Sequence, residues 1–231
     1  MLDKTGERDL LVSILKLTRD GTVQQKLISK DARISNQVAD ELLGKFRQAS
    51  FIQWKGKAID AFPHQRVKIA IHAIKLGADP ERVCRFLQWN EFENIAAEAF
   101  EASNLTVIKH FRFTWAGRRW EIDILGCKKP IVACVDCKHW RRGWKRSAII
   151  RTVKSQVERT QNLTEAFPFL YKEVGLVNWK RATLVPVVLS LIPGPFKFYN
   201  NVPIVPILQL QNFLDELPAH ATFLTRFITS L

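Results

Sequence analysis

Apolar residues recur every three or four positions in four stretches of the first 76 residues, and this spacing predicts amphipathic helices. Thr22 and Ser35 stand where N-caps of the second and third helices are expected, and Pro63 opens the fourth. A fifth stretch alternates about a Lys-Gly-Lys tip, which is typical of a β-hairpin. The predicted elements are helices over residues 7–19, 23–30, 36–48 and 64–76, with the hairpin at residues 51–62.

The rest of the chain combines helical and alternating patterns. Asn90 and Ser147 precede helical patterns as N-caps, and Pro168 is expected to end the second of these helices. Strand patterns rich in valine and isoleucine lie between and after them, with Pro186 expected at a bulge or sheet edge. The predicted elements are helices over residues 91–102, 147–165, 208–217 and 221–228, and strands over residues 105–115, 118–126, 131–138, 181–192 and 202–207.

This order of elements predicts two domains, because a mainly helical part precedes a part that mixes strands and helices. The boundary is placed at Asp79-Pro80, which gives domains over residues 1–78 and 79–231. The second domain begins with a helix and three strands and continues with further helices and strands. We therefore predict an α/β fold in which helices flank a mixed β-sheet.

The amino-acid composition and net charge exclude several classes of protein for this chain. A chain of 231 residues, 47% of them hydrophobic, can bury a sizeable core, which excludes disorder. No apolar run reaches the ~18 residues of a membrane span, and the N-terminus lacks a signal-peptide pattern. The protein is therefore expected in the cytoplasm, associated with the nucleoid. The net charge of +13 indicates a polyanionic partner, with general solubility as the plain alternative.

Cys134 and Cys137 have the spacing of a zinc-binding pair. On a strand, residues three apart point to opposite faces of the sheet, so these two thiols are not expected to bind one ion. All four cysteines are therefore predicted to be reduced core residues, namely Cys84, Cys127, Cys134 and Cys137.

Residues that could bind a metal ion and take part in catalysis lie on two neighbouring predicted strands that are joined by a short turn. Asp123 lies on the first strand, and Asp136 and Lys138 share a face of the second, because residues two apart point the same way. Carboxylates are the usual protein ligands of magnesium, and a bound metal activates water and neutralises phosphate charge. A nearby lysine can orient that water. The plain alternative is a surface hairpin with charged ends.

An acid on one strand and Asp-x-Lys on the next resemble the PD-(D/E)xK nuclease superfamily, which has the restriction-endonuclease-like fold. Asp123 matches the first acid and Asp136-Cys137-Lys138 matches the second half of the motif. Ile122 stands where the family usually has proline. Phe92-Glu93 is similar to a Phe-Glu pair of Mrr-type restriction enzymes and archaeal Holliday junction resolvases. The likeness covers residues 90–165.

The resemblance implies an Mg²⁺-dependent endodeoxyribonuclease, with Mn²⁺ as an alternative metal and no small-molecule cofactor. Asp123, Asp136 and Glu93 would form the metal site, and Lys138 would orient the attacking water. Cleavage of both DNA strands needs two active sites, which indicates a homodimer.

Glu93 also has a second interpretation. It borders the apolar face of its helix, whereas Glu91 lies opposite that face, so Glu93 is the carboxylate that can approach the sheet. With Asn90 as N-cap, however, Glu93 would complete a capping box instead. The sequence leaves both interpretations open.

Two further polar residues are candidate accessory groups. Gln156 falls on the inward face of the helix after the strands, where several related nucleases place a Gln or Lys near the active site. It can equally bond a backbone carbonyl. Glu121 shares the predicted face of Asp123 and either supports the site or is a surface charge.

Basic residues interleaved with tryptophan follow the candidate metal site directly. This pattern suits phosphate binding and stacking on exposed bases, and its plain alternative is a solvated basic loop. The predicted DNA-binding residues of this domain are Arg118, Arg119, Trp140, Arg141, Arg142, Trp144, Lys145 and Arg146.

The first domain resembles a winged helix-turn-helix, in which the third helix enters the major groove and the hairpin contacts the DNA backbone. The predicted DNA contacts are Lys45 and Arg47 on the third helix and Lys55 and Lys57 at the hairpin tip. Asp40 and Glu41 lie on the same helix, and their negative charges disfavour its insertion into the major groove of DNA. Contact with a protein partner or with another copy of the chain is therefore the alternative.

These features predict a metal-dependent endonuclease that hydrolyses DNA phosphodiester bonds in repair, recombination or restriction, with structure-specific cleavage among the options. The alternatives are non-catalytic. One is an inactive nuclease fold that binds DNA, and the other is a winged-helix regulator that binds one sequence tightly.

Overall fold

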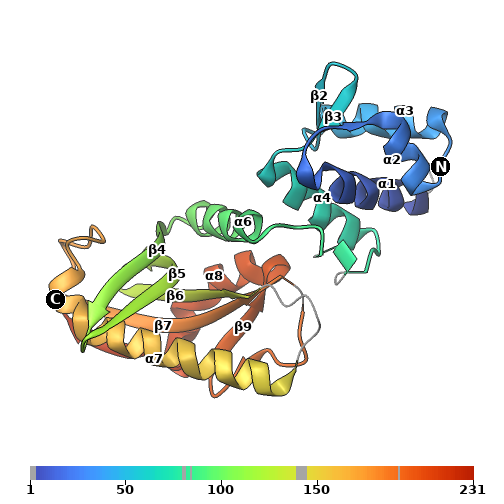
Figure 1. Cartoon of the computed structure of the whole chain (residues 1–231). Helices are drawn as coiled ribbons and strands as arrows, with labels where there is room; N and C mark the ends of the chain where they lie inside the picture. Colours follow the sequence, from blue (N-terminus) through green and yellow to red (C-terminus); the bar gives the residue numbers. More distant parts are fainter. Residues whose placement is uncertain (1–3, 80–81, 84, 139–144, 192) are drawn as a thin grey trace. The chain divides into compact units, whose positions relative to one another are not determined.

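The structure, a computed structural model, describes the chain except for residues 1–3, 80–81, 84, 139–144 and 192. The chain divides into two compact units, Met1–Ile95 and Ala96–Leu231 (Figure 1). Within the described ranges, no helix combines the length and the apolar character needed to cross a bilayer.

The first unit packs helices around a small antiparallel sheet of strand order β1-β3-β2. Its elements are α1 (Lys4–Leu17), β1 (Val23–Gln24), α2 (Gln25–Ala32), α3 (Asn36–Gln48), β2 (Gln53–Lys55), β3 (Ala58–Asp60) and α4 (Pro63–Lys75). Ser35 caps α3 as predicted, its Oγ accepting a hydrogen bond from Val38 N at 3.3 Å. Thr22 is not a cap, because Val23 pairs with Ile59 in the sheet and α2 begins only at Gln25.

A buried ion pair holds the last part of the first unit against its helices. Arg66 on α4 and Glu91 on α6 (Trp89–Ala102) are each 2% exposed, with 2.6 Å between Arg66 Nε and Glu91 Oε1. The other guanidinium hydrogen bonds run to Leu15 O and Thr18 Oγ1 at 2.8 Å each and to Phe86 O at 2.6 Å. The network attaches residues 86–91 to α1 and α4. The division therefore falls inside α6, later than the predicted boundary after residue 78.

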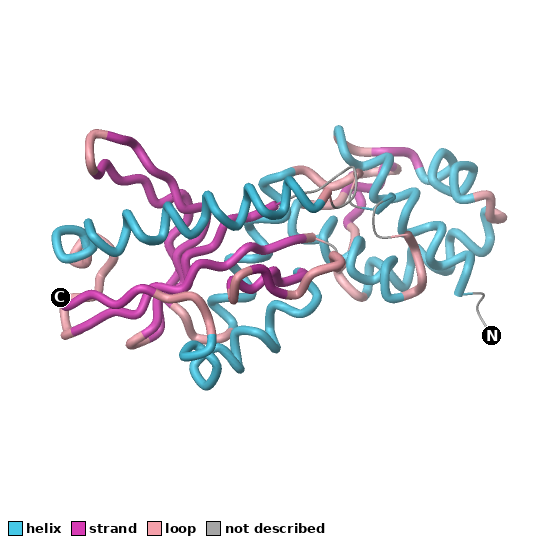
Figure 2. Tube along the Cα trace, turned by 90° about the horizontal axis from the view of Figure 1, so that it is seen from below, coloured by secondary structure: helices cyan, strands magenta, loops and turns pink. Residues whose placement is uncertain are grey.

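The second unit is a mixed sheet flanked by helices, which confirms the predicted α/β class (Figures 1 and 2). The strand order is β4-β5-β6-β7-β9-β8, and β10 also pairs with β7. The first three strands form an antiparallel meander, and β7 joins β6 in parallel. The strands are β4 (Thr106–Trp115), β5 (Arg118–Lys128), β6 (Ile131–Lys138), β7 (Arg181–Ser190), β8 (Phe198–Tyr199), β9 (Val202–Pro206) and β10 (Phe227–Ser230).

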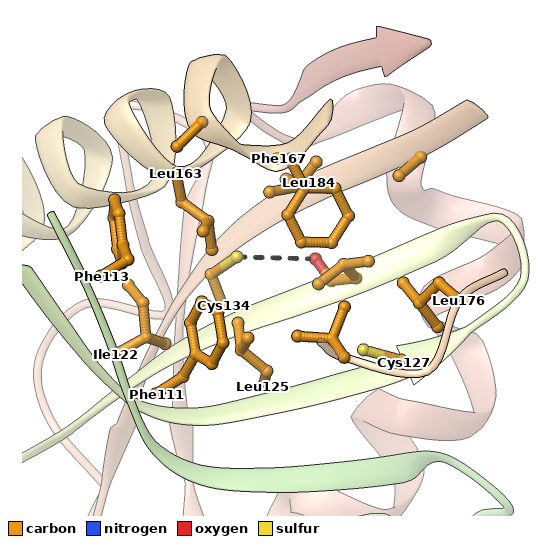
Figure 3. Close-up of a cluster of buried hydrophobic side chains, with 14 of the residues drawn as sticks. Phe111, Phe113, Ile122, Leu125, Cys127, Cys134, Leu163, Phe167, Leu176 and Leu184 are labelled. Carbon is orange, nitrogen blue, oxygen red and sulfur yellow. Dashed lines mark hydrogen bonds between the residues drawn. The ribbon is translucent and has the colours of Figure 1, made fainter. Parts of the chain in front are cut away.

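Helices cover both faces of this sheet (Figures 1 and 2). On one face, Leu163 and Phe167 of α7 (Arg146–Leu170) pack into a core with Leu125, Cys134 and other sheet residues (Figure 3). The other face is covered by the end of α6 and by α8 (Leu210–His220), and Gln211 of α8 donates a 2.6 Å hydrogen bond to Ser103, the residue that follows α6.

Phe100 of α6 packs closely against the backbone of Gly126 on β5. A Cβ at this position would lie 2.3 Å from Cδ1 of Phe100. We expect Gly126→Ala to lower the free energy of unfolding by ~1–3 kcal/mol, because the ring must shift out of a packed position. Urea unfolding checks this. In a Phe100→Leu background the same substitution should cost less, and an equal cost in both backgrounds would contradict the steric explanation.

Three predictions near the helix and chain ends are wrong. Pro168 does not end α7, which continues to Leu170, because a proline in the last turns removes only one backbone hydrogen bond. The same helix begins at Arg146 with Lys145 rather than Ser147 as N-cap. The helix predicted over residues 221–228 is instead a 3₁₀ turn followed by β10.

Pro186 lies in the middle of β7, where a missing N–H would normally weaken a sheet. Residues 181–184 of β7 pair with β10, and residues 188–190 pair with β9. Pro186 faces the gap between these two partners. The proline therefore marks an interruption on one side of the strand, in agreement with the predicted edge position.

Burial of two cysteine thiols gives stability a defined pH dependence. Desolvation raises the pKa of Cys127 to about 12, and burial also raises the pKa of Cys134. Unfolded thiols ionise at pH ~8.5, so the unfolded state releases protons that the folded state keeps. The stability that these two thiols contribute should therefore be constant below that pH and fall as the pH rises from there toward pH ~12. Unfolding free energies at pH 7 and pH 10 test this, and Cys127→Ala should reduce the fall.

Candidate functional site

The β5–β6 hairpin brings Asp123 and Asp136 together where its ladder ends. Ile124 and Val135 are the last paired residues, so Asp123 and Asp136 form the next opposite pair. Directly opposite residues of antiparallel strands have their side chains on the same face. Oδ2 of Asp123 accepts a hydrogen bond from Cys137 N at 2.7 Å. The carboxylate of Asp123 therefore lies against the strand that carries Asp136.

Asp136 is 2% exposed and contacts two cations. Nη1 of Arg159 on α7 lies 2.5 Å from Oδ1, and Nζ of Lys138 lies 2.9 Å from Oδ1 and 2.9 Å from Oδ2. Only the Oδ1 contact of Lys138 has hydrogen-bond geometry, so no donor of the described residues points at Oδ2. A buried carboxylate needs compensating charge, and these two cations supply it.

Gln156 reaches the same strand from α7 and is fully buried. Its Nε2 donates to Cys134 O at 2.7 Å, so the predicted bond to a backbone carbonyl is present. Its Oε1 accepts no hydrogen bond from the described part of the chain. An unpaired buried polar atom costs ~1–3 kcal/mol, and such atoms are typical of places where an ion or water binds.

The oxygen atoms of this region fit a hard divalent cation. Asp136 Oδ2 and Gln156 Oε1 are buried and accept no hydrogen bond from the residues that the structure describes, and the carboxylate of Asp123 lies on the neighbouring strand. Magnesium prefers such oxygen ligands and keeps several waters. Across the residues that the structure describes, no three His, Cys, Asp or Glu side chains gather closely enough to hold a metal. The protein would therefore supply only part of the coordination, with waters completing it.

Glu93 belongs to the first unit, is 5% exposed and accepts a hydrogen bond from the indole of Trp89. Its role at the metal site stays a prediction. The capping-box alternative is wrong, because α6 begins at Trp89 and Asn90 lies inside the helix. Glu91 makes the corresponding bond instead, its Oε2 accepting from Gln88 N at 2.7 Å.

Glu121 is a surface charge. It pairs with Arg112 across the β4–β5 ladder at 3.0 Å and with His110 at 3.4 Å. The hydrogen bond from Arg112 holds the pKa of Glu121 below its usual value, and His110 acts in the same direction. Glu121 and Asp123 are both half-buried, whereas Trp120, Ile122 and Ile124 are buried. This alternation is the one expected if Glu121 and Asp123 share a face of β5, and a supporting role for Glu121 stays a prediction.

The predicted DNA-binding residues of the second unit fall into two groups. Those that the structure describes are exposed, namely Arg118, Arg119, Lys145 and Arg146. Arg118 also pairs with Glu158 at 3.1 Å and lies 4.1 Å over the ring of Trp120. The others lie outside the described residues, namely Trp140, Arg141, Arg142 and Trp144.

In the first unit, two of the predicted DNA contacts take part in surface ion pairs. Lys45 lies 3.5 Å from Glu41, and Lys55 lies 2.5 Å from Asp60. Arg47 is exposed, and Lys57 is exposed at the rim of an open cleft of about 630 Å³. The cleft is lined by Gln24, Gln25, Lys26, Asn36, Asp40, Trp54, Gly56 and Lys57.

Arg159 is the residue of the site that the sequence analysis missed. It follows Gln156 by three positions on α7, so helical spacing places both on one face. That spacing is the one signal in the sequence. It is weak in a chain with 35 lysine and arginine residues.

No family model matches the sequence. An uncharacterized protein of Archaeoglobus fulgidus is 30% identical over 131 residues, which are 57% of this chain and 92% of that protein. The chain belongs to the same family as this archaeal protein. A solved Vibrio cholerae protein matches with a TM-score of 0.43 and 13% identity, over 96% of this chain and 56% of that one. The chain thus spans about half the length of the Vibrio cholerae protein.

Proposed function

We propose that the second unit is the catalytic domain of a divalent-metal-dependent DNA endonuclease of the PD-(D/E)xK type. The observation that carries the proposal is the convergence of Asp123, Asp136 and Lys138 where the β5–β6 ladder ends. Ordinary hairpin ends explain this less well, because Asp136 is 2% exposed and has an oxygen to which no described donor points.

The proposed roles follow from the contacts of each residue. A bound divalent cation would supply Lewis-acid chemistry and an activated water. Asp123 and Asp136 would hold the cation through their carboxylates, with Gln156 Oε1 as a neutral oxygen donor. Lys138 would orient the attacking water and attract the phosphate from its position beside Asp136. Groups fixed before the reaction stabilise developing charge without having to reorganise.

For the first unit, we propose a winged-helix domain that contacts the DNA backbone. Its element order is α1-β1-α2-α3-β2-β3, and β1 pairs with β3 beside the β2–β3 hairpin. Exposed Arg47 and Lys57 suit phosphate contacts. Asp40 lines the cleft beside α3, which favours backbone contact over reading of base edges.

DNA is the proposed partner because the net charge is +13 and exposed arginines lie on the strand that carries Asp123. A double-strand cut would require two copies of the chain, so a homodimer belongs to the proposal. Repair, recombination and restriction substrates all remain compatible with these features.

A non-catalytic DNA-binding protein is the second candidate. The observation that favours it is the pairing of Asp136 with both Lys138 and Arg159, which neutralises the carboxylate without a metal. In that case the residues would form a structural ion network on a nuclease-like sheet.

Cleavage assays separate the two candidates. The full chain is incubated with labelled supercoiled, linear, branched and flap DNA, with Mg²⁺, with Mn²⁺ and with a chelator. The nuclease proposal predicts cleavage of at least one substrate with either metal and none with chelator. Tight DNA binding without cleavage under every condition would support the non-catalytic candidate.

A further inference from the structure

Arg159 has no assigned role in the proposed chemistry, although it makes the shortest contact with Asp136. We propose that Arg159 and the divalent cation compete for Asp136, so that the guanidinium becomes available to a DNA phosphate only after the metal has bound. This inference rests on the proposed metal site and adds a switch to it.

The competition follows from the charges at one carboxylate. Arg159 Nη1 lies 2.5 Å from Oδ1 and Lys138 Nζ lies 2.9 Å from both oxygens, so two positive charges share Asp136. A divalent cation that binds the same carboxylate meets repulsion from both. Its binding is therefore favoured if one of the two cations leaves.

Arg159 is the cation that can leave. Lys138 lies on β6 next to Ser190 of β7, and its ammonium spans both carboxylate oxygens. Arg159 reaches Asp136 from α7 and contacts one oxygen. The two side chains are equally exposed, at 29% for Arg159 and 30% for Lys138, so the number of contacts distinguishes them. Release of Arg159 breaks the contact with Oδ1 alone, whereas release of Lys138 would separate its ammonium from both oxygens.

A released guanidinium suits phosphate recognition. Its planar donors can bind two phosphate oxygens at once, which an ammonium does not do. Metal binding would then raise the affinity for DNA through Arg159 as well as through the metal itself. Because coupling between two ligands is reciprocal, DNA should also raise the affinity for the metal.

Calcium titration of the full chain tests the competition. Isothermal titration calorimetry with Ca²⁺, a hard oxygen-binding cation, is carried out on the parental protein, Arg159→Gln and Arg151→Gln. Arg159→Gln should bind Ca²⁺ at least about fivefold more tightly, the lower end of typical coupling between ligands. Arg151→Gln removes the same charge from an exposed position of α7 and should leave the Ca²⁺ Kd unchanged.

Fluorescence anisotropy with labelled duplex DNA tests the release step. Ca²⁺ should tighten DNA binding by the parental protein, and this gain should shrink in Arg159→Gln. Arg159→Lys keeps a cation beside Asp136, so its Ca²⁺ Kd should stay near the parental value. The Ca²⁺-induced gain in DNA affinity should still be smaller in Arg159→Lys than in the parental protein, because an ammonium lacks the planar pair of donors with which a guanidinium binds two phosphate oxygens.

Each outcome decides one part of the inference. Equal Ca²⁺ binding by the parental protein and Arg159→Gln would overturn the competition while leaving the metal site intact. A full DNA gain in Arg159→Lys would overturn the role of the guanidinium, and this variant keeps the test valid should Arg159→Gln fold poorly. Absence of Ca²⁺, Mg²⁺ and Mn²⁺ binding by the parental protein would overturn the proposed function itself.

Discussion

Asp136→Asn is expected to lower the single-turnover rate constant of DNA cleavage by at least ~10³-fold. A bound metal supplies several kcal/mol of transition-state stabilisation, and each ~1.4 kcal/mol is a factor of ten in rate. Asparagine fills the same space but lacks the charge that holds a cation beside Lys138 and Arg159. The rate is measured with excess protein over labelled DNA at saturating Mg²⁺.

Two controls separate chemistry from folding and binding. Glu121→Gln makes the same chemical change on β5, where the carboxylate pairs with Arg112, and should leave the cleavage rate unchanged. With chelator present, Asp136→Asn should bind DNA at least as tightly as the parental protein, because the exposed basic residues remain and Arg159 no longer pairs with a carboxylate. Cleavage by Asp136→Asn at the parental rate would mean that this carboxylate holds no catalytic metal.

Arg66→Met is expected to destabilise the first unit by ~3–5 kcal/mol, because removal of one partner leaves the other charge of a buried ion pair uncompensated. Arg66 and Glu91 are each 2% exposed, and the guanidinium also binds the carbonyls of Leu15 and Phe86. Hydrogen exchange of the full chain, followed by mass spectrometry, should show faster exchange in α1 and α4. The sheet of the second unit serves as an internal reference.

The double variant Arg66→Met with Glu91→Leu should recover much of this loss, since apolar replacement of both members of a buried pair is often close to neutral. Arg118→Met breaks the exposed pair with Glu158 and should cost less than ~1 kcal/mol. If the buried and the exposed substitutions have the same small effect, the Arg66–Glu91 pair does not hold the unit together.

Local pattern was sufficient to predict the centre of the second unit. The alternation of Ile122, Ile124, Val135 and neighbouring residues predicted the meander, and the short turn predicted which strands are adjacent. The proximity of Asp123 and Asp136 followed from that meander alone. The spacing of Asp123 and Asp136 along the chain predicts their proximity because a short turn joins the two strands that carry them.

The remaining features depend on partners distant in sequence. The composition of residues 227–230 suits either a short helix or a strand. They form a strand because residues 181–184 of β7 offer a free edge with which they pair. Glu91 lies opposite the apolar stripe of α6, yet it is buried because Arg66 on α4 pairs with it. Arg159 joins the site because α7 packs across the sheet. Apart from the weak helical spacing between Gln156 and Arg159, these contacts leave no local pattern in the sequence.

A Mn²⁺ soak of crystals of the full chain, followed by anomalous diffraction, tests the central claim most directly. The account predicts an anomalous peak between the carboxylates of Asp123 and Asp136 within reach of Gln156 Oε1. It also predicts that Arg159 has moved away from Asp136 Oδ1. Absence of a peak there at saturating Mn²⁺, with Lys138 and Arg159 still on Asp136, would contradict a metal-dependent nuclease.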